Sequence, residues 1–141
     1  LQITIEELED LIAHHKPIPE TDLEKQFVDK LTLHATITAV RRHAGGLKHL
    51  YGPSGKKTIA EGKDLTQVKY IIGTGGALTR LPNRKMILGE IALSNKGNDL
   101  LPNAEAEILI DNHYIMASLG VMAKKYPEEA LRLLENSLKG E

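Results

Sequence analysis

The sequence predicts an α/β fold in which a short, mostly parallel β-sheet is flanked by helices. Two short runs rich in β-branched and aliphatic residues, at 68–72 and 107–110, fit buried strands. Helical patterns precede, separate and follow these runs, and this alternating order favours parallel strands joined by helical connections. At 141 residues the chain is long enough to bury a core. Because aromatic residues make up only 4% of the sequence, Leu, Ile, Val and Ala must build that core.

A capping box predicts the first helix. Thr4 is placed as N-cap, with Glu7 three residues later to bond back to it. We expect this helix to end near His15, because Pro17 and Pro19 cannot continue it. Residues 1–20 are therefore predicted to form an N-terminal helix and a linker that precede the main unit at 21–141.

A second capping box, Thr21–Glu24, predicts the longest helix of the chain, which Gly45-Gly46 ends. Apolar residues at four-residue spacing are expected to form its buried stripe. They are Leu23, Phe27, Leu31 and Ala35, and the stripe is widened by Val28, Ile37 and Val40.

A Gly- and Lys-rich stretch at about 45–67 is predicted to be a hairpin or a long loop. Within it, Gly55-Lys56-Lys57-Thr58 resembles part of a phosphate-binding P-loop. That motif requires glycine where Leu50 stands and Ser or Thr where Lys57 stands. A solvated hairpin tip fits these residues better.

The C-terminal half is predicted to contain three more helices. One covers about 82–93, with Pro82 in its first turn and Met86, Ile87 and Ile91 facing inward. The strand at 107–110 ends at Asp111-Asn112, a strong N-cap pair for a helix at about 112–125. The last helix is expected at 127–138.

Composition and charge restrict the function. The net charge of −1 and pI near 6.7 argue against a dedicated nucleic-acid binder. No apolar run has the length of a membrane span, and no signal peptide precedes the first helix. The sequence contains no cysteine, which excludes disulfides and thiol catalysis and fits a cytoplasmic protein.

The histidines and serines indicate neither a metal site nor a nucleophile. His14 and His15 project about 100° apart on a helix, and Asp10 is the only carboxylate at helical ligand spacing from His14. No serine has a His and an acid at a recognised spacing. We therefore predict no catalytic and no metal-binding residue in this chain.

The most informative segment is the strand that runs into Gly73-Thr74-Gly75-Gly76. Each glycine costs about 0.5–1 kcal/mol relative to alanine in a regular element, so the turn must need a positive φ angle or a closely approaching group. A strand, a glycine turn and a helix together are typical of a site where amides face a phosphate. A tight connection without a ligand fits the same residues.

Asp111 is the second candidate residue. It closes the strand at 107–110, at the carboxyl edge of the sheet where α/β proteins bind ligands. It also fits a simple helix N-cap, and the two roles are compatible.

With these residues the chain resembles the C-terminal portion of actin-like, Hsp70-like (ribonuclease H-like) ATPases. Ile71–Gly76 matches the superfamily's adenosine motif, in which two hydrophobic residues lead into a Gly-Gly pair, and 111–120 resembles its final Asp…Ala-x-x-Gly helix start. A closer resemblance, over 22–138, is to the MutL/GlmL family, a namesake of the DNA mismatch-repair MutL whose ATPase motifs are absent here. Four segments carry it: Arg42–Gly45, Glu61–Thr66, the glycine turn and Tyr126–Leu131.

The resemblance implies roles for six residues at an ATP or ADP site. Gly75 and Gly76 match glycines that pass close to the α-phosphate and ribose, and Gly73 and Thr74 shape the turn. Asp111 matches a position that braces the adenosine pocket. Where Hsp70-like proteins carry the arginine that stacks on adenine, this chain has Thr79, and Arg80 follows it.

The resemblance also implies a function beside adenosylcobalamin-dependent mutases. Members of the family are encoded with glutamate mutase and ornithine aminomutase, and the implied role is ATP-linked reactivation as a chaperone, with the mutase subunits as partners. The superfamily's Asp-containing motifs for magnesium and the β- and γ-phosphates are missing here. We therefore expect a fragment that begins at Leu1, is inactive alone, and pairs with the N-terminal remainder of its parent ATPase.

An alternative interpretation is a non-enzymatic interaction or regulatory domain that keeps the ATPase-like fold without nucleotide. In that case the excursion at 45–67 would be the partner surface. A stand-alone enzyme is the least favoured reading, because the chain lacks a convincing nucleophile or acid–base pair.

Overall fold

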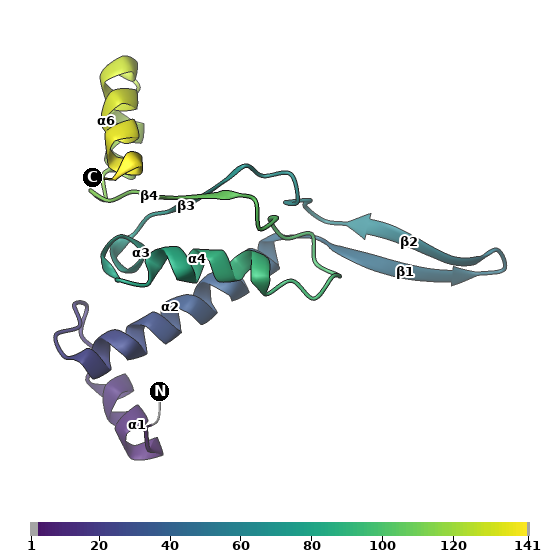
Figure 1. Cartoon of the computed structure of the whole chain (residues 1–141), viewed down its shortest axis with the longest axis horizontal. Helices are drawn as coiled ribbons and strands as arrows, with labels where there is room; N and C mark the ends of the chain where they lie inside the picture. Colours follow the sequence, from purple (N-terminus) through teal and green to yellow (C-terminus); the bar gives the residue numbers. More distant parts are fainter. Residues whose placement is uncertain (1–2, 141) are drawn as a thin grey trace.

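The computed structural model describes residues 3–140. Figure 1 shows an elongated molecule in which a long hairpin and two groups of helices extend from a small central sheet. In chain order the elements are α1 (Ile5–Ala13), α2 (Asp22–His43), β1 (Gly46–Gly52), β2 (Gly55–Glu61), β3 (Tyr70–Gly73), α3 (Gly76–Arg80), α4 (Arg84–Leu93), β4 (Glu107–Ile110), α5 (Met116–Met122) and α6 (Pro127–Lys139).

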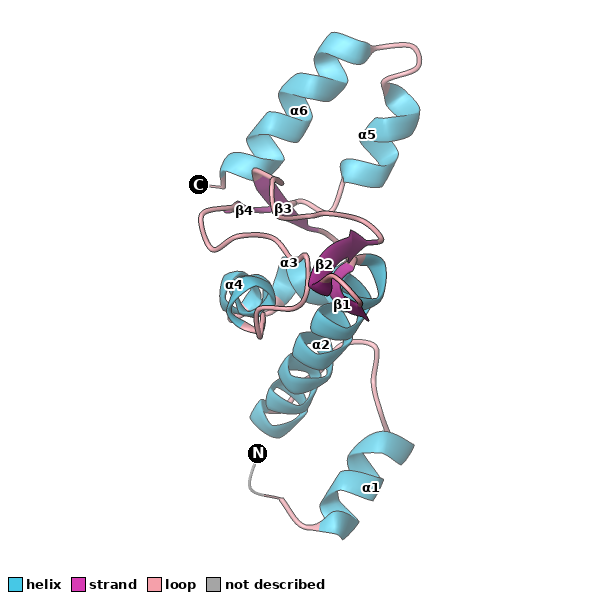
Figure 2. Ribbon diagram, turned by 90° about the vertical axis from the view of Figure 1, so that its right-hand side faces the viewer, coloured by secondary structure: helices cyan, strands magenta, loops and turns pink. Residues whose placement is uncertain are grey.

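The central sheet is a parallel pair covered by helices on both faces. β3 and β4 pair in parallel, with Tyr70 opposite Glu107 and Gly73 opposite Ile110. In Figures 1 and 2, α3 and α4 lie on one side of this pair and α6 lies on the other. α2 packs against the outer side of α4. The predicted mixed α/β fold with parallel strands is confirmed.

The core lies between the sheet and α4. Leu88, Ile91 and Ile110 form its buried centre. Four partly buried side chains, from α2, the two strands and α3, pack around it: Val40, Ile71, Leu78 and Ile108. These residues are all aliphatic, as the scarcity of aromatic residues required.

Both predicted capping boxes are present. Thr4 and Glu7 bond reciprocally at the start of α1, and Thr21 and Glu24 do the same at the start of α2. The ends are also close to expectation, since α2 ends at His43, just before the two glycines. Among the described residues, the helices include none that is both long enough and apolar enough for a membrane crossing.

The predicted apolar stripe of α2 is confirmed in part. Phe27 is buried, whereas Leu23, Leu31 and Ala35 are exposed. Val28, Ile37 and Val40, which widen the stripe, are partly buried, and Val40 packs against the core. The other residues are exposed because α2 contacts its neighbours α3 and α4 along one side only.

The helix expected at 82–93 is divided in two. Residues 76–80 form α3 directly after the glycine turn, and α4 begins only at Arg84. Leu81 between them is extended, with φ −66° and ψ 139°, because the following Pro82 disfavours the helical conformation at this position. Ile87 and Ile91 face inward as predicted, but Met86 is exposed.

The helix expected at 112–125 begins four residues later and is shorter. α5 covers Met116–Met122, because Tyr114 has a φ of 53° that a right-handed helix cannot include. The last helix, α6, matches its predicted range to within one residue.

The excursion at 45–67 is a β-hairpin, one of the two forms predicted. β1 and β2 pair in antiparallel register from Gly46 opposite Glu61 to Gly52 opposite Gly55. Figure 1 shows that the hairpin projects away from the rest of the molecule. Lys56 and Lys57 lie beside its tip and are exposed, as expected for a solvated hairpin rather than a P-loop.

Candidate functional site

The three glycines at the end of β3 and in the turn after it differ in whether the fold requires them. A Cβ atom on Gly73 would lie 2.7 Å from Leu88 Cδ1 and 3.1 Å from Ile110 Cδ1, so core packing excludes a side chain there. Gly75 has a φ of 93°, which an L-residue with a side chain rarely adopts. Neither reason applies to Gly76. Its φ is not positive, and a Cβ atom there would have no heavy atom within 4 Å. The fold leaves an open approach to the backbone at Gly76.

Asp111 lies fully buried at the end of β4, in the same edge of the sheet as the glycine turn. Its Oδ2 accepts hydrogen bonds from Thr74 Oγ1 at 2.9 Å and from the backbone N–H of Met116 at 2.9 Å. Its Oδ1 accepts from Ser137 Oγ at 2.6 Å and from the Ile115 N–H at 3.2 Å. Each carboxylate oxygen therefore has two donors from its own chain.

The hydrogen bonds decide the ionisation of Asp111. Burial raises the pKa of its carboxyl group, but hydrogen bonds from Ser137, Met116, Ile115 and Thr74 together lower that pKa below its usual value. Asp111 is therefore a stable carboxylate at neutral pH, and its charge is balanced by oriented donors rather than by a nearby cation.

A second set of contacts ties α4 and α6 to the turn after β4. The Ser137 carbonyl accepts from the backbone N–H of Asn112 at 3.1 Å and from its Nδ2 at 2.9 Å. Arg84 donates to Asn112 Oδ1 at 3.2 Å and to the Thr79 carbonyl at 3.1 Å. These bonds connect the last turn of α6 with the end of α3.

A pocket of about 400 Å³ opens beside the glycine turn. Part of its wall comes from the start and end of α3, through Gly76, Ala77 and Arg80, and α2 contributes Lys25. The remaining lining residues are mostly apolar: Pro17, Ile18, Pro19, Val28, Leu81, Pro82 and Tyr114. The pocket thus combines exposed backbone at Gly76, two cationic side chains and apolar walls.

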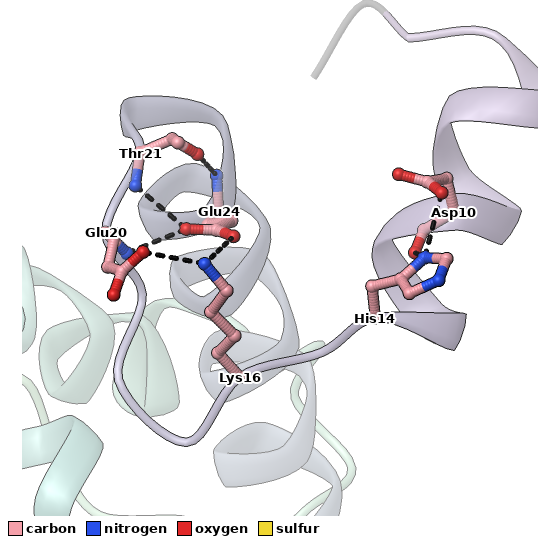
Figure 3. Close-up of polar contacts among 6 residues, drawn as sticks. All are labelled: Asp10, His14, Lys16, Glu20, Thr21 and Glu24. Atoms are coloured by element: carbon pink, nitrogen blue, oxygen red, sulfur yellow. Dashed lines mark hydrogen bonds and ion pairs between the residues drawn. The ribbon is translucent and has the colours of Figure 1, made fainter.

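Ion pairs hold the α1–α2 linker that closes one side of this pocket (Figure 3). Lys16 Nζ lies 2.6 Å from Glu20 Oε2 and 3.8 Å from Glu24 Oε1. Glu24 in turn accepts backbone hydrogen bonds from Thr21 and Glu20, which lower the pKa of its carboxyl group. The exposed Lys16–Glu20 pair spans the segment between them, and the three residues 17–19 of that segment line the pocket.

The six predicted site residues fall into two connected groups. Gly76 and Arg80 line the pocket, and Gly75 is the N-cap of the helix that carries them. Thr74 and Asp111 form the hydrogen-bonded support behind the turn, while Gly73 belongs to the core. Sequence reasoning missed Lys25, Tyr114 and the 17–19 turn, because no local pattern places them opposite the glycines.

This arrangement provides a binding surface. The described residues include no group of three or more His, Asp or Glu side chains placed to hold a metal ion. The two cations and the open backbone suit an anionic ligand, and the apolar walls suit a flat organic group.

Comparison with known proteins identifies the family. The sequence profile of the MutL protein family matches residues 2–138, which is nearly the whole chain. The chain belongs to the MutL family. It is also 34% identical over 125 residues to Protein MutL of Clostridium tetanomorphum. That alignment covers 89% of this chain but only 27% of the relative, so the chain spans about a quarter of its length. No solved structure matches the chain.

We predict that alanine substitutions separate the three glycines. Gly73→Ala should lower the free energy of unfolding by about 1–3 kcal/mol through overpacking. Gly75→Ala should lower it by about 1–3 kcal/mol, because φ 93° with ψ 158° is a conformation that essentially only glycine adopts. Gly76→Ala should stay within about 0.5 kcal/mol of wild type, because its side chain would meet nothing. Urea denaturation of the three variants measures this. A Gly76→Ala variant as unstable as Gly73→Ala would contradict the assignment.

We predict that Asp111→Asn destabilises the fold. The amide NH₂ would replace one carboxylate oxygen and leave the two donors that face this oxygen unpaired, at a cost of about 1–3 kcal/mol for each donor. The folded-state pKa of Asp111 is lowered, so its stabilising effect is complete above the unfolded value of about 3.9 and is lost as the pH falls through the folded-state pKa. The difference in unfolding free energy between wild type and Asp111→Asn should therefore shrink below about pH 4. The exposed Asp22→Asn is the matched control, and a pH-independent difference would refute this role.

Proposed function

We propose that the chain is the C-terminal nucleotide-binding portion of an actin-like ATPase that reactivates an adenosylcobalamin-dependent mutase such as glutamate mutase. The observation that carries the proposal is Gly76, a glycine that neither packing nor backbone conformation requires and that lines a pocket. Membership of the MutL family supports the same proposal, because the glycine turn and Asp111 lie where the family resemblance puts an adenosine site.

The size and lining of the pocket suit a nucleoside. Its volume of about 400 Å³ lies within the range of small-ligand pockets. Val28, Leu81 and the prolines at 17, 19 and 82 provide apolar walls for a base, while the glycine turn provides backbone next to them. A free base would not need cationic neighbours, whereas a nucleotide would.

Charge around the pocket favours the phosphate-bearing form of that ligand. Lys25 and Arg80 are both exposed at the pocket, and no Asp or Glu is among its lining residues. Lys25 Nζ lies 3.4 Å from the exposed Asp22 Oδ1, so part of its charge is already balanced. The positive potential that Arg80 and Lys25 together provide favours ATP or ADP over adenosine alone. In this proposal Arg80 contacts the nucleotide.

Asp111 acts in this proposal as a support for the glycine turn. Both of its oxygens already accept hydrogen bonds from Thr74, Ser137 and two backbone amides, which leaves it poorly placed to bind an ion. Magnesium and the β- and γ-phosphates would be held by residues of the parent protein outside this chain. ATP hydrolysis therefore belongs to the longer protein.

The projecting hairpin favours a second, compatible role in partner binding. Tyr51 pairs with Lys56 on one face of its tip, and Leu50 pairs with Lys57 on the other. All four side chains are exposed. Leu50 and Tyr51 therefore add no buried apolar area to a hairpin that is only marginally stable by itself. The mutase subunits are the partners that we propose for this surface, which would act whether or not nucleotide is bound.

We predict that a longer MutL-family protein containing this chain hydrolyses ATP, whereas the 141 residues alone do not. The reason is that the sequence contains no Asp-x-Gly-Thr/Ser motif of the kind that holds magnesium for phosphoryl transfer in actin-like ATPases. Phosphate release by both proteins, with Gly76→Val in the longer one as the site variant, measures this. We expect Gly76→Val to weaken nucleotide affinity, and so to slow phosphate release by the longer protein at limiting ATP. Phosphate release by the 141 residues alone would contradict the prediction.

We predict that Lys56→Glu with Lys57→Glu weakens the complex with the mutase at least tenfold while leaving the thermal midpoint and nucleotide affinity unchanged. Reversal of two exposed charges at the hairpin tip acts on association and not on the fold. Lys124→Glu with Lys125→Glu is the matched control, because it reverses an adjacent exposed pair elsewhere. Equal binding by both double variants would remove the hairpin from the interface.

A further inference from the structure

Tyr114 has an unusual backbone for a residue with a large side chain. It is the one non-glycine residue among those described that has a positive φ, at 53°. Tyrosine is disfavoured in this left-handed region, which Gly and Asn adopt much more readily. Burial does not explain its presence, because 54% of its surface is exposed.

The surrounding turn demands this backbone but not this side chain. The Tyr114 N–H donates to the Asp111 carbonyl at 3.0 Å, which closes the turn after β4. The next two amides, of Ile115 and Met116, donate to the Asp111 carboxylate at 3.2 and 2.9 Å. All these bonds use backbone atoms at 114–116, so Gly or Asn at position 114 would preserve them with less strain.

The side chain of Tyr114 lines the pocket that also contains Gly76, Ala77 and Arg80. Arg80 and Lys25 supply the positive charges there, and Tyr114 is the sole aromatic residue in the pocket lining. Residues held in unfavourable backbone conformations occur preferentially at ligand sites, where the surrounding structure maintains them. An exposed aromatic ring also provides a surface on which a nucleobase can stack.

We propose that the Tyr114 ring is a stacking face for the purine base of the bound nucleotide, and that ligand binding is why a tyrosine occupies a position suited to Gly or Asn. This inference rests on the proposed nucleotide function and adds to it a residue that determines base affinity. Arg80 and Lys25 then interact with the polar and anionic parts of the ligand, while the ring covers one face of the base.

The test compares Tyr114→Asn with Tyr114→Phe in the chain, with ADP as the probe. Tyr114→Asn should keep or raise the thermal midpoint, because Asn accepts the positive φ, and should weaken ADP binding about 5- to 150-fold. Tyr114→Phe keeps the ring and should bind ADP within about twofold of wild type. Tyr51→Asn, at the exposed hairpin tip, is the control and should leave ADP affinity unchanged.

Proton NMR of the bound ADP provides a direct signature. The adenine H2 and H8 resonances should move upfield on binding to wild type and Tyr114→Phe, because a ring current acts on a stacked base, and this shift should be absent with Tyr114→Asn. If wild type shows saturable binding and Tyr114→Asn binds ADP equally well, this inference is wrong and the proposed function stands. If wild type does not bind millimolar ADP, both are wrong.

Discussion

The buried carboxylate of Asp111 is the interaction on which the rest of this site depends. A buried charge is tolerated only when hydrogen bonds satisfy it, and here the donors come from three separate parts of the chain. Thr74 belongs to the turn after β3, Ile115 and Met116 to the start of α5, and Ser137 to the last turns of α6. One side chain therefore fixes the glycine turn relative to both C-terminal helices.

This constraint explains why the pocket has its particular walls. With the turns after β3 and β4 held together, α3 directs Gly76 and Arg80 towards the same space that Tyr114 enters from the other turn. The α1–α2 linker completes the enclosure, and its ion pairs lie outside the network around Asp111. The site thus combines a rigid support, built on a charge, with a more exposed wall of apolar residues and cations.

The elements that depend on interactions between residues close in sequence were predicted correctly from local sequence patterns. Both capping boxes, the parallel strands, the hairpin and the last helix were predicted correctly, because caps, β-branched runs and glycine turns act over a few residues. The exposed Leu31 and Met86 were predicted to be buried, since periodicity alone cannot say how much of a helix its neighbours cover. Gly76 and Arg80 were predicted site residues, whereas Lys25 and Tyr114 join them only through tertiary structure.

Binding of nucleotide at the glycine turn can be measured by titrating ADP into the isotope-labelled chain and following the backbone amide resonances. We expect saturable shifts that are centred on Gly75, Gly76 and Ala77 and that extend through Thr74 to Asp111, because these residues form the pocket and its support. Shifts confined to the hairpin, or no saturable shifts at millimolar ADP, would contradict the claim that the glycine turn of this MutL-family chain binds nucleotide.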